Sequence, residues 1–80
     1  MKNRKRKENE KKFSDWKPTP NGGRIYWLDV KGKIGWKARY LKEVDENENT
    51  LKFWQEIYDE QNNLVEIHEK YPYDKGHKKL

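Results

Sequence analysis

The alternation of apolar and polar side chains is the feature that most constrains the fold of this chain. Four runs rich in β-branched and aromatic residues alternate with a period of two, over residues 24–30, 34–44, 50–59 and 64–71. This period is typical of strands that have one buried and one solvated face. Short polar segments connect the runs, and Pro72 follows the last one. Because runs so close in sequence pair with their neighbours, the pattern predicts a four-stranded antiparallel meander.

The N-terminal segment has a different composition. Residues 1–12 are nearly all charged, and Phe13 and Trp16 follow at helical spacing. We predict a short, weak helix over residues 5–17, whose two aromatic side chains dock on the sheet. The segment 18–23, Pro-Thr-Pro-Asn-Gly-Gly, cannot continue a helix and is typical of a hinge.

The size and composition of the chain predict a single small domain. Of its 80 residues, 41% are charged and only 31% are hydrophobic, whereas 14% are aromatic. Such an aromatic content argues against disorder and for a core built from aromatic rings. The expected fold class is therefore α+β, a short N-terminal helix followed by a four-stranded antiparallel β-meander. We expect residues 1–20 to form a basic arm, weak helix and hinge, and residues 21–80 to form the sheet domain.

The net charge of +5 at pH 7 favours an anionic partner, nucleic acid before acidic protein. No cysteine is present, so neither a disulfide nor thiol chemistry is expected. No apolar run approaches membrane-spanning length, and no ligand spacing or nucleotide-binding motif predicts a metal or a cofactor. We expect a monomer that acts in the cytoplasm, without a cofactor and without a membrane partner.

The register of the last two runs decides which of their side chains share a face. A three-residue turn at 61–63 collects the most apolar area on one side, which is then the buried side. On the opposite, polar face Glu56 stands across from His68, and Tyr58 across from Glu66. Directly opposed side chains lie about 4.5–5.5 Å apart at Cβ. The same test on the other turns adds further residues to the polar face, namely Trp27, Lys37, Arg39, Lys52, Trp54 and Lys70.

A carboxylate beside an imidazole is suited to cleaving RNA by attack of the ribose 2′-hydroxyl on phosphorus. Glu56 is the candidate base and His68 the candidate acid, and exchanged roles stay open. Glu66 is a second candidate base. Gly76 can turn the chain back, which makes His77 an alternative acid. Proton transfer by positioned groups accelerates such reactions about 10²–10⁴-fold.

Cations and aromatic rings on the same face fit an RNA substrate. The candidate phosphate-binding residues are the cations Lys37, Arg39, Lys52 and Lys70. The candidate base-stacking residues are the aromatics Trp27, Trp54 and Tyr58.

A short helix and a four-stranded meander, with Glu, His and Arg or Lys on its open face, resemble the barnase-like and colicin-type ribonuclease domains of bacterial polymorphic toxins. The likeness to the start of colicin-type ribosome-cleaving domains rests on Gly22, Gly23, Arg24, Trp27, Asp29, Gly32, Ile34 and Trp36. The resemblance implies a toxin domain delivered from a secreted parent protein, with Glu56 and His68 in the acid–base roles. It also implies an acidic immunity protein that binds over the basic face.

A metal-independent endoribonuclease is the favoured hypothesis, and two alternatives stay open. A non-catalytic RNA- or DNA-binding module would use the same cations and Trp side chains, with Glu56 and His68 as an ordinary surface pair. A small protein-interaction or inhibitor domain would need neither. The RNA target, whether tRNA, rRNA or mRNA, also stays open.

Overall fold

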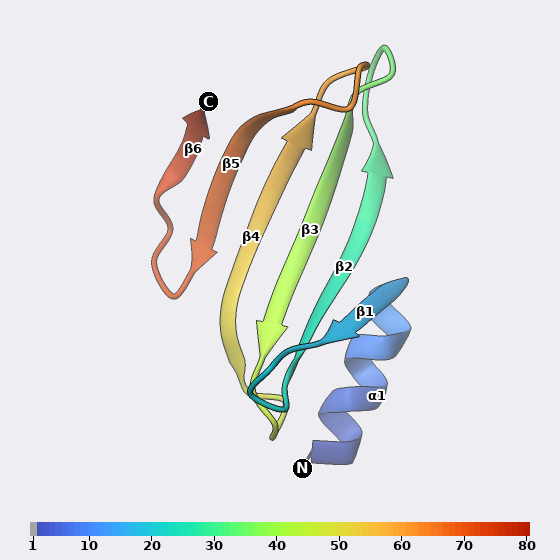
Figure 1. Cartoon of the computed structure of the whole chain (residues 1–80), viewed down its shortest axis with the longest axis vertical. Helices are drawn as coiled ribbons and strands as arrows, with labels where there is room; N and C mark the ends of the chain where they lie inside the picture. Colours follow the sequence, from blue (N-terminus) through green and yellow to red (C-terminus); the bar gives the residue numbers. More distant parts are fainter. Residues whose placement is uncertain (1) are drawn as a thin grey trace.

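The computed structural model describes residues 2–80, which form one helix and a six-stranded antiparallel sheet (Figure 1). The order of the strands in the sheet is their order in the sequence, so each strand pairs only with its neighbours along the chain. In chain order the elements are α1 (Lys2–Lys12), β1 (Asp15–Pro18), β2 (Arg24–Lys31), β3 (Lys37–Val44), β4 (Thr50–Tyr58), β5 (Leu64–Tyr71) and β6 (Gly76–Lys79).

The expected number of strands was wrong, because a short strand is added at each edge of the predicted meander. β1 begins in the segment predicted as helix, ends at Pro18 of the predicted hinge, and pairs with β2. β6 lies in the tail, where His77 pairs with His68 of β5. Each added strand has four residues, too few to show an alternating pattern in the sequence. They form because tight turns return the chain to a long neighbouring strand, with Gly22 at a φ of 82° and Gly76 at a φ of 68°.

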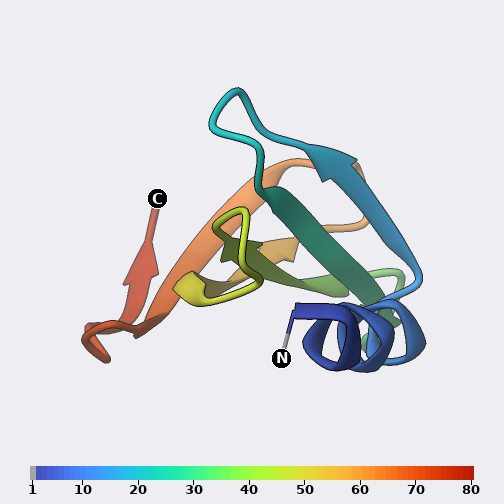
Figure 2. The same cartoon turned by 90° about the horizontal axis from the view of Figure 1, so that it is seen from below.

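The core lies between helix α1 and one face of the sheet, which we call the helix face (Figure 2). Phe13, Tyr26 and Val44 are almost completely buried there, with 4%, 0% and 1% of their surface exposed. The Phe13 and Tyr26 rings meet at a tilt, with centroids 5.9 Å apart. Burial of each large apolar side chain stabilises the fold by about 1.5–3 kcal/mol. The partly buried side chains packed against this cluster are Leu28, Tyr40 and Phe53.

A buried carboxylate fixes helix α1 to the β3–β4 turn. The Glu48 side chain has no exposed surface and accepts hydrogen bonds from Arg6 Nε at 2.8 Å, Tyr26 OH at 2.9 Å and Asn9 Nδ2 at 3.2 Å. Burial works to raise the pKa of Glu48, but the hydrogen bonds from Arg6, Tyr26 and Asn9 outweigh it and hold that pKa below its usual value. The basic helix is therefore docked on the sheet by a charge as well as by Phe13.

The β3–β4 and β4–β5 hairpins share one turn design. The Asp45 and Asp59 carboxylates each accept hydrogen bonds from the backbone N–H groups two and four residues further on. The fourth residue of each turn has positive φ, 64° at Glu48 and 65° at Asn62. In both hairpins the pairing then shifts by one residue just after the turn. Such side-chain-capped turns followed by a bulge set the register of the strands.

The bulge in β5 overturns the predicted register of the β4–β5 hairpin. Val65 is the extra residue, and beyond it Glu56 pairs with Ile67 while Gln55 pairs with His68. Because a slip by one residue moves every side chain to the other face, Glu56 and His68 lie on opposite faces of the sheet. The prediction that these two side chains stand across from each other was wrong.

Over β2, β3 and β4 the predicted faces are confirmed. Arg39 pairs with Asp29 on one side and with Glu56 on the other, and Leu41 likewise lies between Trp27 and Trp54. These side chains point away from helix α1, and we call their side of the sheet the open face. It carries seven of the predicted site residues, namely Trp27, Lys37, Arg39, Lys52, Trp54, Glu56 and Tyr58.

Candidate functional site

The predicted site residues are divided between the two faces of the sheet. The open face has the seven residues just given, whereas the helix face has Glu66, His68 and His77, as the register of β5 and β6 requires. Lys70 is an unpaired bulge residue, and its contact with the Tyr40 ring places it on the helix face too. Three of the four candidate catalytic residues therefore come together, and Glu56 does not join them. The group of Glu66, His68, Asp74 and His77 is called the histidine cluster below.

The two histidines of the chain are cross-strand neighbours. His68 of β5 pairs with His77 of β6, and their rings are tilted by 50° with centroids 4.3 Å apart. Gly76, at positive φ, begins β6 and brings His77 back beside β5. Gly76 was expected to turn the chain back toward the polar face that carries Glu56. It does turn the chain back, but the returning segment is a paired strand and His77 lies on the helix face.

Each imidazole is held by its own carboxylate. His68 Nε2 and Asp74 Oδ1 form a hydrogen bond of 2.6 Å, and His77 Nδ1 lies 3.0 Å from Glu66 Oε1. The hydrogen bond with His68 holds the pKa of Asp74 below its usual value, and the Gly76 N–H, at 2.9 Å, acts in the same direction. A carboxylate on one ring nitrogen fixes the orientation of the ring and defines the nitrogen left for a substrate.

The two imidazoles differ in exposure. The His68 side chain is 13% exposed, and its Nδ1 is buried without a hydrogen-bond partner among the described residues. The His77 side chain is 49% exposed. A buried polar atom without a partner costs about 1–3 kcal/mol. Sites that carry such a cost are often functional.

Two lysines lie beside the histidine cluster. Lys70 follows His68 by two positions and places its Nζ 5.3 Å from the centre of the Tyr40 ring, on the helix face. Lys79 follows His77 by two positions and pairs with Glu66 across the strands. Positive charge is therefore available on both strands next to the imidazoles, as an anionic substrate requires.

On the open face, Glu56 is occupied as a hydrogen-bond acceptor. Trp54 Nε1 donates to it at 3.1 Å and Tyr58 OH at 2.7 Å. Burial and the bond to Glu56 raise the pKa of Tyr58 to about 12. Glu56 therefore accepts hydrogen bonds from two aromatic side chains, while both histidines lie on the other face of the sheet.

The cations of the open face are largely paired. Arg39 forms two hydrogen bonds to Asp29, at 2.7 and 3.0 Å, and Lys37 Nζ lies 3.8 Å from the same carboxylate. The hydrogen bonds from Arg39 hold the pKa of Asp29 below its usual value. Lys52 contacts Glu69 at 3.3 Å. This face combines aromatic surface with nearly balanced charge, so it attracts phosphate less than the sequence suggested.

Asp74 belongs to the histidine cluster but was not among the site residues predicted from the sequence. Its side chain accepts the hydrogen bond of the Gly76 N–H, the local bond typical of an Asp that starts a turn. An Asp-Lys-Gly sequence flanked by polar residues is a turn signal, and it predicts a hairpin that would have brought Asp74 and His77 to β5.

Within residues 2–80, no group of three or more His, Cys, Asp or Glu side chains is arranged to hold a metal ion. No helix in the described part of the chain is long and apolar enough to cross a membrane. Comparison with family models, with curated proteins and with solved structures found no match. The resemblance to toxin ribonucleases accordingly stays a prediction, and the function is argued from the geometry alone.

Proposed function

We propose that this domain binds RNA and cleaves it by acid–base chemistry at His77 and His68, without a metal ion. The observation that supports the proposal is the contact of the two imidazoles, with centroids 4.3 Å apart and a separate carboxylate on each ring. Histidine exchanges protons near neutral pH and is the side chain used most often for such transfers. Lys70 and Lys79 supply positive charge for the phosphate.

His77 is the better placed base, because Glu66 lies at its Nδ1 and leaves Nε2 for the substrate. In the proposed reaction His77 Nε2 takes the proton of the ribose 2′-hydroxyl, and the 2′-oxygen forms a bond to phosphorus. The bond from phosphorus to the 5′-oxygen breaks, and that oxygen takes the Nε2 proton of the His68 imidazolium, which becomes a neutral imidazole. The products are a 2′,3′-cyclic phosphate and a 5′-hydroxyl.

His68 donates its proton only when the leaving oxygen replaces Asp74 at Nε2. Asp74 belongs to the segment between β5 and β6, and its side chain is 65% exposed. The exchange therefore needs no movement of the core around Tyr26. Asp74 keeps the proton on Nε2 of His68 until the substrate arrives.

The test is incubation of the purified protein with RNA in EDTA, followed by identification of the product ends. We expect 2′,3′-cyclic phosphates, and we expect His77→Ala to lower the rate by about 10²–10⁴-fold. Glu56→Gln is the matched control, since Glu56 lies on the opposite face. A His77→Ala variant with full activity, or a Glu56→Gln variant without any, would contradict the assignment.

A second candidate is a non-catalytic RNA- or DNA-binding module, and helix α1 favours it. The helix presents a dense set of exposed cations, namely Lys2, Arg4, Lys5, Lys7, Lys11 and Lys12. Contacts of this kind bind the nucleic acid backbone without regard to sequence. A gel shift of intact RNA, with affinity that falls steeply as salt rises, would support this candidate. A protein-interaction or inhibitor domain would show neither cleavage nor a shift.

We also propose a cellular setting for the ribonuclease. It acts in the cytoplasm, is delivered from a secreted parent protein and is neutralised by an acidic immunity protein. The net charge of +5 supports an acidic partner.

A further inference from the structure

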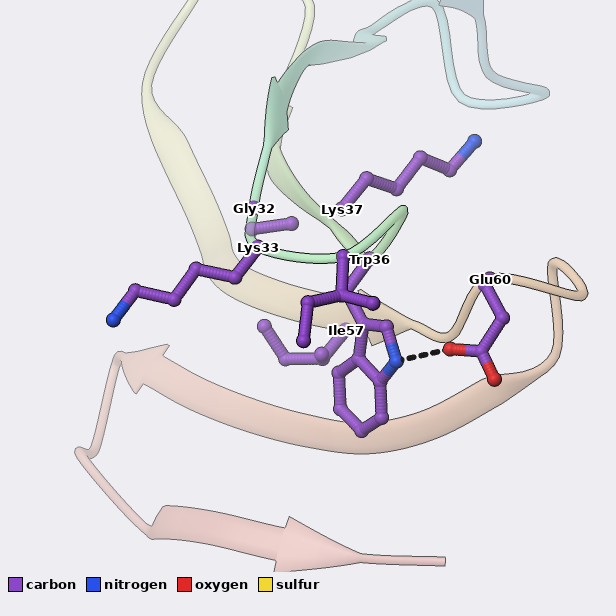
Figure 3. A pocket seen from close by; sticks show the side chains of 8 residues that line it. Gly32, Lys33, Trp36, Lys37, Ile57 and Glu60 are labelled. Atoms are coloured by element: carbon purple, nitrogen blue, oxygen red, sulfur yellow. Dashed lines mark hydrogen bonds between the residues drawn. The ribbon is translucent and has the colours of Figure 1, made fainter.

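An apolar hollow lies on the helix face at the end of the sheet where β2 meets β3 (Figure 3). Its volume is about 550 Å³, and its walls come from the β2–β3 turn, from Ala38 and Ile57 of the sheet, and from Glu60. Figure 3 shows the Trp36 indole standing in the hollow next to Ile57, with Lys33 and Lys37 extending outward on either side.

The Trp36 ring is held in place although much of it is exposed. Its Nε1 donates a hydrogen bond of 2.5 Å to Glu60, and 41% of the residue is exposed. Ile34, on the same turn, is 89% exposed at a φ of 54°. A β-branched residue is rarely found at positive φ, and this exposed position gains nothing from burial. The turn thus presents apolar surface that the fold itself does not use.

Cross-strand pairing connects the wall of the hollow to the histidine cluster. Ala38 pairs with Ile57, Ile57 with Glu66, and Glu66 with Lys79, so one row of side chains runs from the hollow to the cluster. His77 lies two strands from Ile57 and one row along. Adjacent strands are about 4.8 Å apart and adjacent rows about 6.7 Å, so Ile57 and His77 are roughly 12 Å apart.

Positive charge for an anionic ligand comes from one lysine of the hollow and one lysine of the neighbouring β6. Lys33 lines the hollow, and Lys79 pairs with Glu66 on the same face of the sheet. Glu60 is the acid in the wall, and its carboxylate is already bound to Trp36, whereas the Nζ of Lys37 lies on the open face near Asp29. The matching ligand has a flat apolar body and a negative charge close by, which describes a nucleobase with its phosphate. Bases in a duplex are already stacked on one another, so only a single strand can insert one.

We infer that this hollow binds a nucleobase of single-stranded RNA on Trp36, next to the phosphate that His77 and Lys79 contact. The inference deepens the proposed function and rests on it, because it makes the hollow the substrate subsite of the histidine cluster. Stacking of a base on an aromatic side chain contributes a factor on the order of tenfold in affinity.

The test measures binding in a His77→Ala background, so that RNA is not cut. We expect Trp36→Ala to weaken binding of a fluorescently labelled single-stranded RNA on the order of tenfold, with Trp36→Tyr keeping most of the affinity. Trp16→Ala is the matched control, since Trp16 is 43% exposed, close to the value for Trp36, but lies in β1 against Arg24. Thermal unfolding of each variant identifies any that fail to fold, and Trp36→Tyr tests the same contact with a ring retained.

Equal affinity of Trp36→Ala and its parent would overturn the inference, and so would binding of the same RNA as a duplex with equal affinity. Binding of polyglutamate in a Trp36-dependent manner, with no binding of RNA, would overturn it in favour of an acidic protein partner. Because the test reads binding only, it is separate from the cleavage assay. A Trp36-dependent preference for single strands in a protein that never cuts RNA supports the subsite and refutes the catalysis.

Discussion

The Nδ1 atom of His77 lies 3.0 Å from the Oε1 atom of Glu66, across the pair of strands that ends the sheet. His77 itself pairs with His68, so Glu66 reaches its ring diagonally from two positions earlier on β5. A carboxylate in this place favours the proton on Nδ1 and leaves Nε2 free to accept a proton.

Replacing the carboxylate of Glu66 tests that relationship. Glu66→Gln keeps the shape of the side chain but no longer favours the proton on Nδ1, so we expect cleavage to slow by up to about 10⁴-fold with little change in KM. The measurement is steady-state cleavage of a single-stranded RNA. Glu43→Gln, in β3, is the control and is expected to keep the wild-type rate; an unaffected Glu66→Gln would remove Glu66 from the mechanism.

The buried carboxylate of Glu48 predicts how stability depends on pH. Because its pKa in the folded state lies below the ordinary 4.5, its contribution is present above that pH and is lost as the pH falls through the folded-state pKa. At neutral pH we expect Glu48→Gln to cost about 1.5–3 kcal/mol, the usual scale for hydrogen bonds to a charged group. The measurement is urea unfolding as a function of pH.

Glu46→Gln is the control for that measurement, because Glu46 is exposed in the same turn. We expect its unfolding free energy to match that of the wild type. Equal stability of Glu48→Gln and Glu46→Gln at neutral pH would show that the Glu48 contacts with Arg6 and Tyr26 contribute nothing net.

The pair of Tyr58 and Glu56 predicts a spectroscopic signal at high pH. The pKa of Tyr58 is raised from 10.0 to about 12, so the protonated phenol stabilises the fold below pH 10 and that contribution is lost as the pH rises through 12. Absorbance titration of tyrosinate detects the shift. In Glu56→Gln the negative charge is absent, and the late titration should move toward 10. An unchanged titration would mean that burial alone causes the shift.

The hydrogen bonds that the Asp59 carboxylate accepts in the β4–β5 turn predict that its removal destabilises the fold. Asp59→Ala removes the acceptor for the N–H groups of Gln61 and Asn63, so we expect a cost of about 1–2 kcal/mol in thermal unfolding. Gln61→Ala is the control, because the Gln61 side chain is exposed and only its backbone takes part. Loss of stability in the control but not in Asp59→Ala would show that the Asp59 side chain does not stabilise the turn.

The sequence predicted the two faces of the sheet correctly in the long strands, where apolar and polar side chains alternate regularly. Trp27 was expected on the polar face, and its pairing with Leu41 on the open face confirms it. The alternation determines faces well there because Tyr26 is buried completely, so the wrong face would expose a large ring.

The relation of Glu56 to His68 was not predictable from alternation, because β5 contains a bulge. Ile67 and His68 are both partly buried, so apolar area does not decide between the two registers. The missed signal lies in the turns, since Asp-Glu-x-x-Asn occurs at 45–49 and again at 59–63. Both copies form the same turn with the same bulge after it.

β6 is an edge strand of the sheet, joined to β5 alone through four residue pairs. The pairing of a short edge strand opens and closes more readily than the interior of a sheet. His68 and His77 are in contact only while β6 is paired with β5, whereas the core around Tyr26 does not depend on that pairing. In the proposed mechanism only molecules with β6 paired to β5 are competent, and a phosphate bridging Lys70 and Lys79 would raise their fraction by holding the two strands together.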